Sequence, residues 1–363
     1  MEIPVKHPEP DIKLFKQVIL GQTIPSRPPF TELFLDNEVT AAISRDYLGL
    51  KWLNPSNDRE SRKAYWDNLI EVFYRLGYDY VRVWGNLDFP GNNRLADDTS
   101  MLSRGKRRWT EEGKGPISSW EDFENYPWPS LDKANLWDYE YVASHVPEGM
   151  GVFVGPTCGF FEVPMNILFG YENLCYMLFE DPGLVEAVIE KTGQLIYGFY
   201  KKLIGLPNLA GFYQGDDMGF KSSTLIAPDI LRKYILPWHK KLSLLAHDNN
   251  HLYLLHSCGN LESIMEDLID DVKIDGKHSF EDEILPVNDF KKKYGSRVGI
   301  LGGVDIGKLC MLDEDGLRKY VRGILDVCME NGRYALGSGN SVCNYIPIRN
   351  YFIMLEEGLN WGK

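Results

Sequence analysis

The sequence predicts a parallel (β/α)8 barrel with an N-terminal extension and an insertion after the second strand. Eight short apolar segments alternate with stretches of helical periodicity, and this alternation requires parallel strands joined by crossover helices. Eight such repeats in 363 residues match one large barrel domain over 1–363. An open, doubly wound sheet is the alternative, but no predicted strand ends in a dinucleotide-binding or P-loop glycine motif.

The predicted strands are short and end at glycine or polar residues. They cover 30–35, 78–84, 151–155, 209–214, 252–255, 272–275, 298–301 and 333–336. The polar, proline-rich segment 1–29 precedes the first strand. Residues 87–149 are charged and aromatic and contain several turn signals. We expect this segment to fold over one end of the barrel, with surface elaboration as the alternative.

Composition excludes several classes of partner. A net charge of −13 argues against binding to nucleic acid or to anionic membranes, because both require a basic surface. The N-terminus lacks the apolar core of a signal peptide, and no apolar run is long enough for membrane insertion. Six cysteines without an export signal indicate the reduced thiols of a cytoplasmic protein.

One short motif suggests a metal site. His256 and Cys258 follow the apolar run 252–255, so they lie where a strand is followed by a helix. Residues two apart on a strand point to the same face. An imidazole nitrogen and a thiol sulfur that converge in this way suit tetrahedral zinc. The spacing alone is weak, and an incidental pair is the alternative.

Other polar residues gather at the predicted carboxyl ends of the strands, where barrel enzymes have their active sites. We predict that Asp217 and His278 take part in catalysis. The predicted substrate-binding residues are Arg27, Asn86, Asp216, Asp305 and Asn340, and Cys158 is expected to line the pocket. Asp216 and Asp217 also suit a helix cap, and His278 also suits a core histidine bonded to backbone.

A candidate for a third metal ligand follows the last predicted strand. Cys343 follows strand 333–336, which opens at the same mouth of the predicted barrel as the strand before His256. His256, Cys258 and Cys343 together would leave one position open, as catalytic zinc requires. The alternative is that Cys343 enters the last helix and points elsewhere.

The chain resembles the uroporphyrinogen decarboxylase superfamily over nearly its whole length. The segments that carry the resemblance are Arg27-Pro28-Pro29-Phe30, Tyr126-Pro127-Trp128-Pro129, Gly215-Asp216-Asp217-Met218-Gly219, Gly302-Gly303-Val304-Asp305 and Pro347-Ile348-Arg349-Asn350. The resemblance implies a (β/α)8 barrel, in agreement with the strand count.

Within this superfamily, His256-Ser257-Cys258-Gly259 resembles the zinc motif of methylcobamide:thiol methyltransferases of the coenzyme M type, which the decarboxylases lack. The decarboxylases carry an arginine-rich N-terminal motif, whereas 24–29 has only Arg27, so porphyrinogen decarboxylation is not expected. The second cysteine of the methyltransferases would fall near 339–341, and Cys343 is offset from it. Asp217 or Glu162 is therefore an alternative third ligand.

The resemblance implies a zinc-dependent methyltransferase. It would move a methyl group between a corrinoid, carried by a partner protein, and a small-molecule thiol or folate. The corrinoid protein would cover the barrel mouth near 87–149. Two alternatives remain: a metal-free, decarboxylase-like enzyme for another carboxylated substrate, and a non-catalytic accessory to a corrinoid protein.

Overall fold

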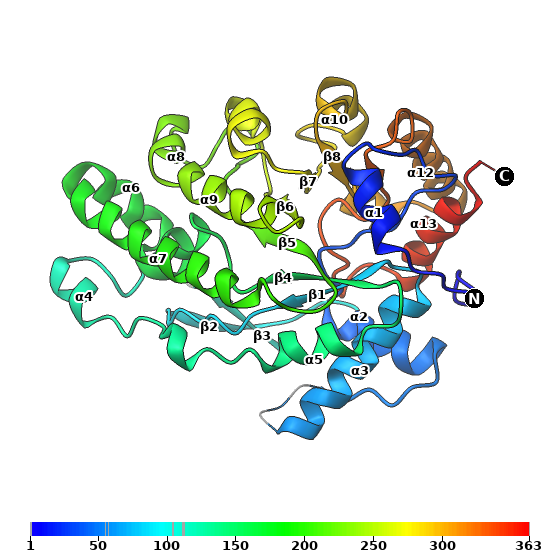
Figure 1. Cartoon of the computed structure of the whole chain (residues 1–363), viewed down its shortest axis with the longest axis horizontal. Coiled ribbons are helices and arrows are strands. Elements are labelled where there is room, and N and C mark those ends of the chain that lie inside the picture. Colours follow the sequence, from blue (N-terminus) through cyan, green and yellow to red (C-terminus); the bar gives the residue numbers. More distant parts are fainter. Residues whose placement is uncertain (1, 55, 57, 104, 111–112, 363) are drawn as a thin grey trace.

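The core of the molecule is a curled sheet of seven parallel strands, and helices lie around its outer face (Figure 1). The computed structural model describes residues 2–54, 56, 58–103, 105–110 and 113–362. The sheet has the order β1-β4-β5-β6-β7-β8-β9. Its strands are β1 (Tyr80–Trp84), β4 (Gly151–Gly155), β5 (Leu209–Gly215), β6 (Leu252–His256), β7 (Gly276–His278), β8 (Gly299–Leu301) and β9 (Tyr334–Ala335). The predicted α/β class is therefore confirmed, whereas the ladder has seven strands and not the eight of the predicted barrel.

The first predicted strand, 30–35, forms isolated bridges where a full strand was expected. Phe30 pairs in parallel with Leu336, directly after β9. On the other side, the hydroxyl of Tyr80 on β1 accepts the backbone N–H of Glu32 at 3.1 Å. The segment thus lies between the two edge strands of the sheet but makes too few regular hydrogen bonds to count as a strand.

The sixth strand begins after the range predicted for it, 272–275. A π-helical turn covers Asp267–Val272, and Lys273 then takes a left-handed conformation with φ 62°. Strand β7 begins only at Gly276. The prediction was wrong because a short apolar run fits a buried helical turn as well as a strand.

The helices flank the sheet, and most of them connect successive strands and pack on its outside. They are α1 (Ile12–Ile19), α2 (Asn37–Ala42), α3 (Arg59–Arg75), α4 (Trp120–Asn125), α5 (Trp137–His145), α6 (Tyr171–Glu180), α7 (Pro182–Leu203), α8 (Pro228–Tyr234), α9 (Leu236–His247), α10 (Val287–Tyr294), α11 (Ile306–Met311), α12 (Glu314–Cys328) and α13 (Ile348–Asn360). None of the helices in the described part of the chain has the length and apolarity needed to cross a membrane.

The predicted insertion, 87–149, contains two different kinds of structure. Strands β2 (Asn93–Asp97) and β3 (Lys106–Thr110) form an antiparallel hairpin, whereas α5 packs on β1, β4 and α3. Helix α5 is therefore part of the connection between β1 and β4. Residues 104, 111 and 112 lie outside the described residues.

The interior of the curled sheet is closed at the amino ends of the strands. The ring of Phe15 on α1 lies 5.3 Å from that of Tyr80 and 5.9 Å from that of Phe153, both edge-on. All three side chains are fully buried. Because α1 plugs this end, an open site can form only at the carboxyl ends of the strands.

Candidate active site

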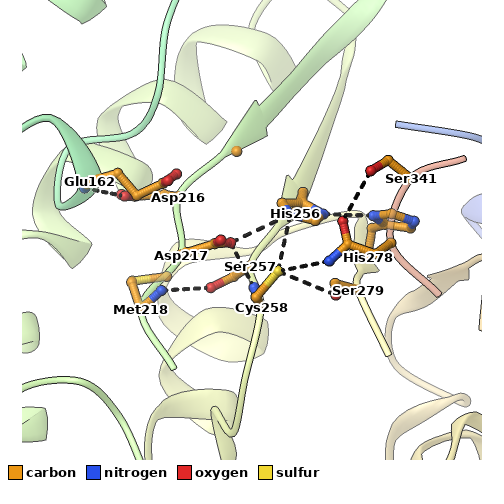
Figure 2. A network of polar contacts seen from close by, with 12 residues as sticks. Glu162, Asp216, Asp217, Met218, His256, Ser257, Cys258, His278, Ser279 and Ser341 are labelled. Carbon is orange, nitrogen blue, oxygen red and sulfur yellow. Dashed lines mark hydrogen bonds and ion pairs between the residues drawn. The ribbon is translucent and has the colours of Figure 1, made fainter. Parts of the chain in front are cut away.

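Three potential metal ligands converge at the carboxyl ends of β5 and β6. The two strands run parallel, with Gly215 paired to His256, so Asp217 and Cys258 both follow just beyond the same edge. One ligand atom from each of Asp217, His256 and Cys258 lies within 4.8 Å of the others. Figure 2 shows the three side chains pointing toward one another.

The spacing of these atoms suits a tetrahedral metal. His256 Nε2 lies 3.4 Å from Cys258 Sγ and 3.4 Å from Asp217 Oδ1. In a tetrahedron with bonds of about 2.0–2.3 Å, neighbouring donor atoms lie roughly 3.3–3.8 Å apart. One nitrogen, one sulfur and one oxygen are also donor types that zinc accepts, and three ligands leave a fourth position open. The residues present therefore fit a catalytic zinc site.

A chain of hydrogen bonds fixes which nitrogen of His256 is free. His278 Nε2 lies 3.3 Å from the carbonyl oxygen of Ser338, which can only accept, so this nitrogen carries the proton. Burial holds the pKa of His278 well below its usual range, and the neutral ring leaves Nδ1 as an acceptor. His256 Nδ1–H donates to it at 2.7 Å. His256 Nε2 therefore presents a lone pair to Cys258 and Asp217.

The charge state of His256 agrees with this arrangement. Burial lowers the pKa of His256 to about 3, so the ring is neutral at physiological pH. A neutral imidazole whose other nitrogen is held by a fixed hydrogen bond is the usual form of a metal-binding histidine. His278 thus orients His256 through this hydrogen bond, and its predicted part in catalysis stays a prediction.

The sulfur of Cys258 is held by two further side chains. Asn340 Nδ2 donates to Sγ at 3.2 Å, and Ser279 Oγ does so at 3.6 Å. Burial, and then the charge of Asp217, raise the pKa of the Cys258 thiol. The thiol is therefore protonated unless a metal replaces the proton, since metal ligation requires the thiolate.

Asp216, next to Asp217, is held inside the fold by hydrogen bonds. It is fully buried and accepts the backbone N–H groups of Phe161 and Glu162, at 3.0 and 2.8 Å. His239 Nε2 lies 2.8 Å from its second oxygen. Asp216 therefore joins β5 to the turn at Phe161 and to α9, and its carboxylate has no face open to a substrate.

Glu162 lies beside this group of ligands (Figure 2). Its carboxylate accepts the backbone N–H of Asp217. Burial, and then the charges of Asp217 and Asp216, raise the pKa of Glu162 well above its usual range. Glu162 therefore holds a proton to higher pH than an exposed glutamate does.

A cavity of about 790 Å³ opens above these residues. Its lining includes Asp217, His256 and Cys258, as well as the predicted site residues Asn86, Cys158 and Asn340. Asn86 donates from Nδ2 to Asp138 at 2.7 Å. The cavity is large enough for a small-molecule substrate.

Comparison with known proteins identifies the family. A family model described as uroporphyrinogen decarboxylase (URO-D) matches residues 146–359. The chain belongs to this family. The resemblance inferred from the sequence motifs is thereby confirmed.

Two relatives from Methanosarcina mazei show what this URO-D family member is similar to. A methylated-thiol–coenzyme M methyltransferase is 25% identical over 181 residues, which are 50% of this chain and 46% of that protein. The chain therefore spans about half the length of this curated relative. A solved structure of a methyltransferase superposes with a TM-score of 0.71 at 16% identity, over 98% of this chain and 100% of the other. The two proteins share their fold.

Three predicted site residues lie apart from the group of ligands. Cys343 is not among the converging ligand atoms, and its Sγ lies 3.6 Å from Ser341 Oγ. Asp305 caps α11 by accepting the N–H of Lys308 at 3.0 Å. Arg27 lies near Phe30, with its guanidinium 6.0 Å from the ring, at the closed end of the sheet.

Arg82 lines the cavity but was not among the predicted site residues. Side chains at alternate positions of β1 point into the curled sheet, and Tyr80 in this series is fully buried there. Arg82 and Trp84 continue the same face and line the cavity. A charged residue in an otherwise apolar strand was the signal that could have revealed it.

Proposed function

We propose that this protein is a zinc-dependent methyltransferase that moves a methyl group from a corrinoid on a partner protein to a small-molecule thiol. The observation that carries the proposal is the convergence of Asp217, His256 and Cys258 at the open end of the sheet. The relative named for methyl transfer to coenzyme M supports the same class of reaction.

In this proposal, Asp217 replaces Cys343 as the third metal ligand. Asp217 Oδ1 faces His256 Nε2 and is held by the backbone N–H of Cys258 at 2.8 Å. One carboxylate and one thiolate together balance the charge of a divalent ion. Cys343 then has no part in metal binding.

Each residue around the metal has a separate task. His278 keeps the lone pair of His256 Nε2 directed at the metal position, and Asn340 and Ser279 hold the sulfur of Cys258. Zinc bound here supplies one effect, which is to lower the pKa of a thiol at its open position. In the reaction, the thiol would lose its proton to solvent and its sulfur would bond to the methyl carbon, while the electron pair of the broken Co–C bond would stay with the corrinoid.

The cavity lining argues against the decarboxylase-like alternative. That alternative predicts several cationic groups for a multiply carboxylated substrate. Of the arginines that line the cavity, Arg62 is paired with Asp138 and Arg107 with Asp36. Arg82, the third arginine of the lining, has no carboxylate partner among the described residues, and one such cation is too few for this kind of substrate.

Methyl transfer from methylcobalamin to a thiol tests the proposal. We expect His256→Ala and Cys258→Ala to lower the rate by about 100-fold or more, because the contribution of a catalytic metal amounts to several kcal/mol. Cys343→Ala is the matched control and should keep the wild-type rate. Unchanged rates in both ligand variants would refute the assignment. Transfer to a folate with no transfer to thiols would replace the acceptor but keep the metal site.

A further inference from the structure

Two neighbouring helices expose large aromatic side chains to solvent. On α6, Tyr176 and Phe179 are 58% and 87% exposed, and on α4 Trp120 is 46% exposed. The two helices lie together at the end of the molecule that is far from both chain termini (Figure 1). None of the three side chains lines the cavity of the candidate active site. They therefore have no part in the site described above.

The three rings belong to one region of the surface. Tyr176 and Phe179 are three residues apart, so they are neighbours on the same face of α6. Trp120 Nε1 donates to Asp181 Oδ2 at 2.9 Å, which places the indole beside the end of α6, two residues beyond Phe179. A single exposed ring needs no explanation, whereas a group of them marks an interaction surface. Trp120, Tyr176 and Phe179 are called the aromatic patch below.

The aromatic patch lies in a strongly acidic part of the chain. From 115 to 190 the sequence has thirteen Asp and Glu residues and a single basic residue of the Lys or Arg type, Lys133. This segment therefore carries nearly all of the net charge of −13. Exposed glutamates on the same two helices surround the rings, and these are Glu121, Glu124, Glu172 and Glu180. None of these four carboxylates forms an ion pair with another described residue.

Aromatic rings among unpaired carboxylates select one kind of partner. Nucleic acid and anionic lipid surfaces are repelled by the negative charge. A wholly apolar partner would take the glutamates out of water without supplying a counter-charge. Lysine and arginine suit both features, because their charged ends pair with carboxylates and also stack on aromatic rings. The chain contains such a contact elsewhere, with Lys241 Nζ 3.7 Å from the centre of the Trp238 ring.

We propose that the aromatic patch is a docking surface for a partner protein whose contact face presents lysine and arginine side chains around an apolar centre. The three rings supply the contact area at the core of the interface, as aromatic residues commonly do. The four glutamates form its rim, where they attract the partner and fix its orientation. The inference does not depend on the proposed function, because it concerns a surface outside the cavity.

The binding of short peptides tests the docking surface. Three peptides alternate leucine with arginine, with glutamate or with serine, and fluorescence anisotropy gives each Kd. We expect only the arginine peptide to bind the wild type, and Phe179→Ser to weaken this binding by about tenfold or more, as truncation of a central aromatic residue does. Phe220→Ser is the matched control, because Phe220 is 61% exposed but lies outside the patch. It should keep the wild-type Kd.

The contribution of the acidic rim is measured separately. The double variant Glu121→Gln, Glu180→Gln should bind the arginine peptide more weakly than the wild type. It should also show a smaller increase of Kd with salt, because fewer charges remain to be screened. Glu148→Gln, an exposed position before β4 and outside the patch, is the control and should keep the salt dependence of the wild type.

Three results would overturn the proposal. Equal binding of the arginine peptide by the wild type and Phe179→Ser would show that net charge alone attracts it. No binding of this peptide below about 1 mM would show that the patch does not recognise basic side chains. A wild-type dimer that becomes a monomer in Phe179→Ser, as measured by sedimentation, would show that a second copy of the chain covers the patch.

Two further measurements keep these results interpretable. The thermal unfolding of each variant should match that of the wild type, because the substituted side chains are exposed. Methyl transfer from free methylcobalamin should also be unchanged in every variant, since none of the substituted residues lines the cavity. Failure of the docking surface is therefore distinct from failure of the proposed function.

Discussion

The carbonyl oxygen of Ser338 determines, through His278, which ring nitrogen of His256 carries the proton. It accepts the hydrogen bond of His278 Nε2–H, which makes His278 Nδ1 an acceptor and directs the lone pair of His256 Nε2 toward Cys258 and Asp217. In the proposed metal site, affinity for the metal would then depend on residues that do not touch it, as is general for ligands held by a second layer of hydrogen bonds.

Glu32 supports Ser338 from the interior of the sheet. Its carboxylate accepts the backbone N–H of Ser338 at 2.8 Å and its hydroxyl at 2.5 Å. Glu32 is fully buried, and burial raises its pKa from 4.5 to about 8. The folded protein thus keeps a proton that the unfolded chain releases above pH 4.5. The raised pKa makes stability fall as the pH rises between these two values.

Glu32→Gln should remove this pH dependence. The amide can replace both hydrogen bonds to Ser338 but does not titrate. We expect the free energy of unfolding of the variant, relative to wild type, to increase by on the order of 3 kcal/mol between about pH 5 and about pH 7.5. Urea denaturation at the two pH values measures it. Glu148→Gln, at an exposed position, is the control. If the free energy of unfolding changes equally with pH in Glu32→Gln and in the wild type, Glu32 is ionised in the folded state.

At the scale of single residues, the sequence predicted the convergence of those side chains whose positions depend on local geometry. His256 and Cys258 converge because they are two apart on one extended segment. Asp217 follows the neighbouring strand, so its nearness to them depends on the register between β5 and β6. The place of Cys343 depends on the path of the loop after β9, and spacing in the sequence does not encode that path.

Two adjacent aspartates at the end of β5 show how one strand end serves both fold and site. Asp216 points back toward α9 and the turn at Phe161, whereas Asp217 points to His256. Side chains of neighbouring residues in extended backbone face opposite ways, which explains the division.

This division predicts a larger loss of stability for a variant of Asp216 than for the matched variant of Asp217. Asp216→Ala leaves buried His239 and two backbone N–H groups without their acceptor, so it should cost on the order of 3 kcal/mol or more of unfolding free energy. Asp217→Ala loses one hydrogen bond from Cys258 and should cost about 1 kcal/mol. Urea denaturation of both variants, after treatment with a chelator, measures the difference. A larger loss for Asp217→Ala would contradict the assigned roles.

At the scale of elements, the sequence placed the central strands well and short segments poorly. Asp181 followed by Pro182 predicts the start of α7, and the carboxylate of Asp181 does accept the N–H of Leu184 at 3.0 Å. The error at 272–275 arose where an apolar run spans fewer than two helical turns. Periodicity cannot be measured over so short a stretch.

At the scale of the whole molecule, alternation of strands and helices predicted the parallel sheet but not its closure. Closure depends on how 30–35 meets β9 and β1, and there the chain makes single bridges. The plug of Phe15 against Tyr80 and Phe153 was also absent from the prediction, because helix α1 is remote in sequence from the strands that it covers. Such contacts between distant segments are set by packing.

The zinc content of the purified protein tests the central claim most directly. We predict about one zinc per chain in the wild type, the same amount in Cys343→Ser, and loss of zinc in Asp217→Asn and Cys258→Ser. Metal analysis after purification without chelator gives the number. No zinc in the wild type, or loss of zinc in Cys343→Ser with retention in Asp217→Asn, would contradict the proposed metal site.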